Sequence, residues 1–214
     1  VTYTSTSDTA TSDSFTFKVN DGTVDSAAAT VSLAIAAVND NPTKVNLSSL
    51  TIDENASSEE IGTLSTDDPD TSDTFTYELT SGEGDTDNSL FAIASDKLKN
   101  IDAFDFETKS SYSVRVKSTD SGSASIEGIF AITVNNINDI SVTSTVVNTY
   151  CDGSDGVGSI TITSSNTNGT VSYSWTGPNG FTSSDQNLTD LESGTYTVLV
   201  KDDSFEKSFD IVIE

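Results

Sequence analysis

The stretch SYSVRVKSTDSG, residues 111–122, alternates bulky apolar residues with small or polar ones and then runs into an acidic turn that contains glycine. Alternation with a period of two residues is typical of a β-strand that buries one of its faces. The same pattern recurs along the chain in SFTFKV (14–19), TVSLAIAAV (30–38), TFTYEL (74–79), IFAITV (129–134), SITIT (159–163), VSYSW (171–175), TYTVLV (195–200) and FDIVI (209–213). The sequence therefore predicts a chain made almost wholly of strands.

Turn-forming segments separate these strands. Among them are NDGT, DPDTSD, SGEGD, DGSDG and GPNG, in which Gly, Asn, Asp and Pro supply the backbone conformations that tight turns need. No segment predicts a convincing helix. Short strands at regular spacing, joined by such turns, indicate antiparallel Greek-key sandwiches. We therefore expect an all-β fold of tandem immunoglobulin-like β-sandwiches in a linear array.

Two short links, VNDNP (38–42) and INDI (137–140), interrupt the strand pattern and lie 99 positions apart. That interval matches the roughly 100 residues of one immunoglobulin-like sandwich. The links divide the chain into three expected domains: the C-terminal part of one sandwich in residues 1–42, a complete sandwich in 43–139, and a smaller one in 140–214. We expect the first, incomplete sandwich to belong to a longer polypeptide or to be completed by another copy.

Composition narrows the classes of function. The chain has 214 residues with 9 Lys plus Arg against 34 Asp plus Glu, and its formal net charge is -25. This charge would repel the phosphates of nucleic acids and anionic membranes, and no apolar run approaches the ~20 residues of a membrane helix. We expect neither nucleic-acid binding nor membrane insertion. Because the chain has no His, imidazole-based triads and the usual zinc and copper sites are excluded, and we expect no enzyme activity.

The acidic residues of the middle domain gather at the ends of its predicted strands. In an up-and-down strand order, alternate turns of a sandwich meet at the same pole. One set would meet at the incoming link: Asn39, Asp40, Asn41, Asp68, Asp70 and Asp120. Another set would meet at the outgoing link: Glu54, Asp105, Glu107, Asn136, Asn138 and Asp139. Carboxylate and carbonyl oxygens suit Ca²⁺, although the same acids could simply be solvated loop residues of a soluble acidic surface.

These motifs, taken in order, resemble the cadherin repeat and most closely its bacterial form. DEN (53–55), DPD, DFE, STDSG and the VNDNP link follow one another in the family's order. The resemblance implies Ca²⁺ as the cofactor, the two sets above as its ligands, and neighbouring repeats of the same polypeptide as partners. The sequence departs from the pattern at both links, because Ala37 and Asn136 replace their opening Asp and Ile140 replaces the last Asn of the second. We therefore expect the firmer site at the first link.

The C-terminal segment 151–202 resembles the SprB-type repeat of the large gliding and surface adhesins of Bacteroidota. The matching pieces are CDGSDG, VSYSWTGPNG, NLTDLESGTYTV and VKD. The resemblance implies a small sandwich. Trp175 and Tyr196 are expected to fill its core, whereas an exposed Trp175 would favour a carbohydrate site. Cys151 has no partner for an internal disulfide.

Two three-residue strings, DTA (8–10) and DSA (25–27), resemble the O-glycosylation acceptor of Bacteroidota. They make Thr9 and Ser26 candidates for modification.

Together the resemblances imply a stalk segment of a large secreted adhesin on a bacterial cell surface, exported by type 9 secretion and serving adhesion or gliding motility. Ca²⁺ at the junctions would fix the angle between domains and so project an adhesive tip. Two alternatives stay open: a carbohydrate-binding accessory module, and a subunit of a self-associating surface filament. The expected partners beyond the polypeptide itself are surface polysaccharide or other cells.

Overall fold

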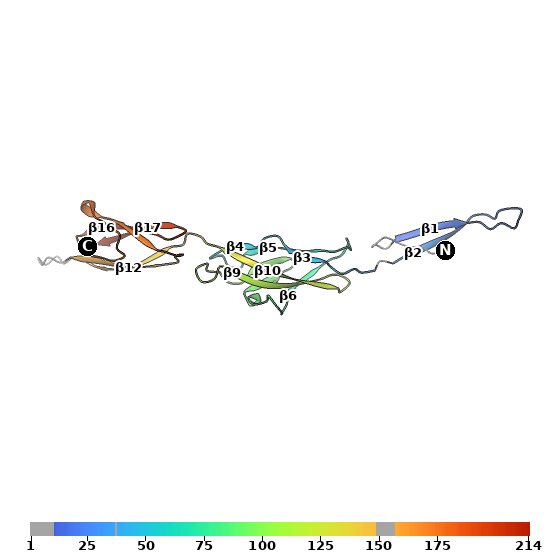
Figure 1. Cartoon of the computed structure of the whole chain (residues 1–214), viewed down its shortest axis with the longest axis horizontal. Helices are drawn as coiled ribbons and strands as arrows, with labels where there is room; N and C mark the ends of the chain where they lie inside the picture. The colour runs from blue at the N-terminus through green and yellow to red at the C-terminus, as the bar shows by residue number, and fades with distance from the viewer. Residues whose placement is uncertain (1–10, 37, 149–156) are drawn as a thin grey trace. The chain divides into compact units, whose positions relative to one another are not determined.

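The computed structural model describes residues 11–36, 38–148 and 157–214, which form strands, turns and two short 3-10 helices (Figure 1). The prediction of an all-β fold is confirmed. The chain divides into two compact units: one comprises residues up to 103 together with 111–133, and the other comprises 104–110 together with residues from 134 onward. The division at residues 42 and 139 stays a prediction. Among the described residues, no helix has both the length and the apolarity needed to cross a bilayer.

The first unit contains two four-stranded sheets. One has the order β3-β5-β8-β7, formed by Lys44–Leu47, Glu60–Asp67, Lys97–Asn100 and Phe91–Ala94. The other has the order β4-β10-β9-β6, formed by Thr51–Asp53, Ser125–Asn135, Ser111–Thr119 and Thr76–Leu79. Val45 and Leu64 of the first sheet pack with Val116 of the second in one apolar cluster. The two sheets therefore form a sandwich.

Strand β9 carries the predicted alternation. Its residues are alternately buried and partly exposed, and the inward row consists of Tyr112, Val114, Val116 and Ser118. Ser118 is polar, yet its hydroxyl forms a 2.7 Å hydrogen bond with the hydroxyl of Thr66. This pairing satisfies a buried polar group at the end of the core, next to the acidic turn that follows β9.

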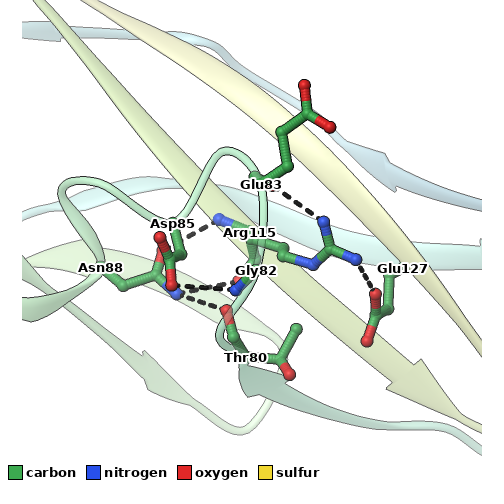
Figure 2. Close-up of polar contacts among 7 residues, drawn as sticks. All are labelled: Thr80, Gly82, Glu83, Asp85, Asn88, Arg115 and Glu127. Atoms are coloured by element: carbon green, nitrogen blue, oxygen red, sulfur yellow. Dashed lines mark hydrogen bonds and ion pairs between the residues drawn. The ribbon is translucent and has the colours of Figure 1, made fainter.

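Strand β6 pairs with residues 116–119 at one edge of β9. The segment that follows β6, up to the 3-10 helix η1 (Asn88–Leu90), lies along the part of this edge that β6 leaves unpaired (Figure 2). The Asn88 amide donates to the carbonyls of Thr80 and Arg115 at 2.9 and 3.3 Å, and it accepts from the Arg115 N–H at 2.9 Å. The Arg115 guanidinium donates to the Glu83 carbonyl at 2.8 Å and forms an ion pair with Glu127. Asn88 thus pairs with the strand edge as a neighbouring strand would, which protects the edge from unwanted pairing.

The second unit is also built from two sheets. One has the order β11-β12-β15, formed by Ser141–Val147, Gly158–Ser165 and Leu188–Leu191. The other has the order β14-β13-β16-β17, formed by Thr182–Ser183, Ser172–Thr176, Gly194–Lys201 and Glu206–Ile213. The second 3-10 helix, η2, spans Pro178–Gly180.

The core of the second unit surrounds Trp175, which is 0% exposed. Its indole N–H donates to the Asp185 carbonyl at 2.8 Å. Tyr196 is also buried, and its hydroxyl donates to the Glu192 carbonyl four residues earlier at 3.0 Å, as in the tyrosine corner of immunoglobulin-like sandwiches. The prediction that Trp175 and Tyr196 fill the core is confirmed.

A third element, the hairpin of β1 (Thr11–Phe17) and β2 (Ala29–Ile35), forms a two-stranded antiparallel sheet. Ser26 lies in the exposed loop between these strands, where its hydroxyl accepts from the Val19 N–H at 3.0 Å. The candidate glycosylation residue Thr9 and the single cysteine, Cys151, lie outside the described residues.

Candidate metal site

Three carboxylates gather in the loop that follows β5. Carboxylate oxygens of Asp68, Asp70 and Asp73 all lie within 4.8 Å of one another. Two local hydrogen bonds shape the loop: the Asp68 side chain accepts from the Asp70 N–H at 2.8 Å, and the Asp73 N–H donates to the Asp70 carbonyl at 3.1 Å. Pro69 restricts the backbone between the first two acids. The loop therefore holds like charges close together by its own turn geometry.

The incoming link meets this loop. The Asp40 N–H donates to the Asp70 carboxylate at 2.7 Å. The Asn39 amide donates to the Asp120 carboxylate at 3.0 Å and to the Asp40 carbonyl at 3.0 Å. The structure thus brings together five of the six residues predicted to meet at the incoming link, and Asn41 follows them as an exposed residue of the link.

The turn between β9 and β10 supplies the other wall of the site. Asp120 is only 7% exposed, and its second carboxylate oxygen accepts from the Ala124 N–H at 2.8 Å. The Ser121 hydroxyl donates to Asp73 at 2.8 Å. A Cβ atom on Gly122 would lie 2.0 Å from the Asn39 side-chain oxygen, so only glycine leaves room for the Asn39–Asp120 contact. The turn is therefore shaped to receive the link.

Two oxygens of the cluster lack the partners that burial normally demands. The second carboxylate oxygens of Asp68 and Asp73 are buried and accept no hydrogen bond. In the described part of the chain, no Lys or Arg forms an ion pair with these carboxylates. Each pair of like charges at this spacing costs about 1 kcal/mol in water and several-fold more in a medium of lower dielectric constant. A bound cation would remove this repulsion and satisfy both oxygens.

The chemistry of the site fits a hard cation. All of its side-chain donors are oxygens or amides, and the chain holds no His. Carboxylate, carbonyl and amide oxygens are the ligands of Ca²⁺, whereas structural zinc sites use Cys and His. The acidic groups of this loop can therefore hold a metal ion.

Sequence reasoning missed Asp73, Ser121 and Gly122. Asp73 belongs to the DPDTSD string, but its approach to Asp68 depends on how the turn folds back, which spacing alone does not reveal. Ser121 and Gly122 directly follow the predicted Asp120. A signal for Gly122 was present, since a glycine after an acidic turn residue often allows close approach of another backbone or side chain.

The residues predicted for the outgoing link are divided between the two units. Glu54 follows β4 in the first unit and is 2% exposed. In the second unit, Asn136 donates to Glu107 at 3.4 Å, and Asn138 donates to the Glu206 carbonyl at 3.1 Å.

The other two residues of that set, Asp105 and Asp139, accept hydrogen bonds from residues outside the set. Asp105 accepts from the N–H and the hydroxyl of Thr108, which closes its own turn. Asp139 accepts from the Asn166 amide at 3.1 Å. A metal site formed by this set stays a prediction.

Comparison with known proteins bears on the fold. No family model matches the chain, and no curated protein matches its sequence. Among solved structures, human CDH23 EC21-23 matches with a TM-score of 0.62 and 14% identity over 95% of this chain and 74% of that one. The chain has a cadherin-like fold.

Two protocadherin structures match over a smaller share of their own length. The Protocadherin GammaB4 extracellular domain gives a TM-score of 0.53 and 17% identity, over 96% of this chain and 37% of that one. Protocadherin Gamma B2 extracellular cadherin domains 3-6 give a TM-score of 0.50 and 17% identity, over 79% of this chain and 46% of that one. The chain thus spans less than half of either structure.

Proposed function

We propose that this chain is a stalk segment of a secreted cell-surface adhesin, in which Ca²⁺ bound at the first link stiffens the polypeptide. The proposed role is mechanical and involves no catalysis. The observation that carries it is the meeting of the 38–42 link with the acidic loop after β5, through the Asp40–Asp70 and Asn39–Asp120 hydrogen bonds. The link is therefore placed where a cation held by the loop would also hold the link.

The proposed mechanism follows from charge. Without a cation, repulsion among Asp68, Asp70 and Asp73 opposes the compact arrangement of the loop, and the link is held to the sandwich by few contacts. A cation that binds only the assembled arrangement stabilises it by mass action. The link then changes from a pivot into a rigid connection, and repeats in series form a rod that transmits load.

The cadherin-like fold and the acidic composition support an extracellular role. The finer parts of the proposal rest on sequence resemblance: a bacterial cell surface, export by type 9 secretion, and an SprB-type repeat in residues 140–214. Neighbouring repeats of the same polypeptide are the proposed first partners. Carbohydrate binding receives no support from Trp175, because its side chain lies in the core and its indole N–H is already bonded.

Mobility of the link tests the proposal. Val38 is 76% exposed, so a spin label there reports the motion of the link without disturbing a core. In the full chain carrying Cys151→Ser, we expect added Ca²⁺ to slow the label and a chelator to restore its motion. Asp68→Asn should abolish the response.

Glu83→Gln is the matched control, because Glu83 is an exposed acid of the same unit and its side chain points away from the loop contacts in Figure 2. It should leave the response unchanged. If Ca²⁺ binds to the chain and the label at Val38 moves as freely as before, the stiffening role is wrong.

A further inference from the structure

The hairpin β1–β2 has one apolar face that the described residues leave uncovered. Its register pairs Phe15 with Val31 and Phe17 with Ala29, so these four side chains lie on one face together with Leu33 and its charged partner Asp13. Phe15 and Phe17 are 47% and 48% exposed. The opposite face carries mainly Ser, Thr and Ala. A hairpin with this division of residues is built to pack against another layer.

The chain contains a second copy of this hairpin in the same register. The pairs Phe15↔Val31 and Phe17↔Ala29, moved by 99 positions, become Val114↔Phe130 and Val116↔Gly128 of β9 and β10. The same shift carries the turn residue Asp21 onto Asp120, with no insertion or deletion between the strands. The two hairpins are therefore the same structural unit.

In the second copy, the equivalent face is covered, and only Gly128 and Phe130 on it are partly exposed. Val114, Val116 and Ile132 are each 0% exposed, and Val116 packs with Val45 and Leu64 of the sheet β3-β5-β8-β7. The edges are covered as well, because β6 pairs with β9 and β4 pairs with β10. Within the described residues, the hairpin β1–β2 has neither a covering sheet nor a flanking strand.

We propose that the apolar face of β1–β2 is the docking surface for a four-stranded antiparallel sheet of the β3-β5-β8-β7 kind, supplied by the same polypeptide on the N-terminal side of the hairpin. In the covered copy, the sheet comes from residues 44–100, which precede the hairpin in the same chain. A second copy of this chain has only its own hairpin face to offer, and pairing two such faces leaves all four strand edges open. An isolated two-stranded hairpin is marginally stable in water, so the docked sheet is what orders it.

A chain with a built-in cover tests this proposal. Residues 1–11 are replaced by a second copy of residues 43–110, which reproduces the natural spacing between a covering sheet and its hairpin. Hydrogen exchange of the amides in 12–35 is compared with exchange in the 214-residue chain. We expect exchange to slow by about 100-fold or more, toward the rates of β9 and β10. Unchanged exchange would overturn the proposal.

A variant of the extended chain tests whether the natural side chains of the β1–β2 face fit the covering sheet. Asp13→Tyr, Phe15→Val and Phe17→Val give the hairpin the inward residues of β9. If only this variant slows exchange, the natural face does not fit such a sheet and the proposal is wrong. Sedimentation of the 214-residue chain supplies the last test: a monomer is expected, and a dimer that Phe15→Ser with Phe17→Ser dissociates would show that a second copy covers the face.

Discussion

Gly122→Ala is the substitution whose effect the structure defines most sharply. The backbone of Gly122 lies outside the left-handed region, so alanine is tolerated there as far as conformation is concerned. Its Cβ, however, would lie 2.0 Å from the Asn39 oxygen, where ordinary contacts begin at 3.4 Å. Asn39 must therefore retreat by roughly 1.4 Å, since a glycine is the only residue that leaves this space. The bond from Asn39 to Asp120, now 3.0 Å, would be lost.

The free energy that the Asn39–Asp120 hydrogen bond contributes sets the size of the expected effect. A hydrogen bond to a charged acceptor contributes about 1.5–3 kcal/mol, and partial exposure brings this contact to about 1–2 kcal/mol. Hydrogen exchange of the segment 36–42, measured in the presence of a chelator, reports the local opening free energy. We expect exchange in this segment to become about 5–30-fold faster in Gly122→Ala.

The same substitution made in an Asn39→Ala background isolates the clash. With the Asn39 side chain gone, Gly122→Ala should be neutral or stabilise the turn by about 0.4–1 kcal/mol, because alanine lowers the entropy of the unfolded chain. The sign of the effect therefore changes between the two backgrounds. If Gly122→Ala accelerates exchange equally in both, the packing of Asn39 over Gly122 is not what holds the link.

Three further predictions concern the scaffolds of the two units. Asn88→Ala should lower the free energy of unfolding of the first unit by about 2 kcal/mol, because the Arg115 N–H loses its acceptor. Urea titration measures this change, and a loss under about 0.5 kcal/mol would contradict the role of Asn88 in covering the strand edge. Tyr196→Phe should cost the second unit about 1 kcal/mol, measured by Trp175 fluorescence, and no change would mean that the Glu192 contact is dispensable. Burial opposes ionisation of Asp202, but backbone N–H bonds from Asn168, Phe205 and Ser204 outweigh it and lower the pKa of Asp202. This carboxylate therefore adds stability above its unfolded pKa of about 3.9 that is lost as the pH falls through the lower folded value, so Asp202→Asn should flatten the acid limb of the stability curve; an unchanged limb would refute this.

Much of the fold could be predicted because strand alternation survives in the packing. SYSVRVKS became β9 with its alternate residues inward, and the core positions of Trp175 and Tyr196 followed from their size and pattern. The approach of DPD and STDSG to the first link also followed from strand order, since alternate turns share a pole. These features depend on periodicity and order along the chain, which a sequence displays directly.

The remaining features depend on single contacts between residues, which produce no repeating pattern in the sequence. The Asn88 amide covers the edge of β9 through two hydrogen bonds with Arg115 and holds the Thr80 carbonyl with a third, and nothing in SGEGDTDNSL distinguishes this asparagine from an ordinary turn residue. Asp73 joins Asp68 only because the turn folds back on itself. The sequence predicted that residues 1–42 are part of a sandwich. That the hairpin β1–β2 is equivalent to β9–β10 could be recognised only from the register in which the strands pair.

Calcium titration by calorimetry tests the central claim most directly. The full chain is compared with Asp68→Asn, Asp73→Asn and the control Glu83→Gln, all at the same ionic strength. We expect the full chain and the control to show a saturable heat of Ca²⁺ binding that both loop variants lose or weaken by at least about tenfold, because each removes a carboxylate ligand. Equal binding by all four proteins, or none by the full chain, would contradict a calcium site at the first link.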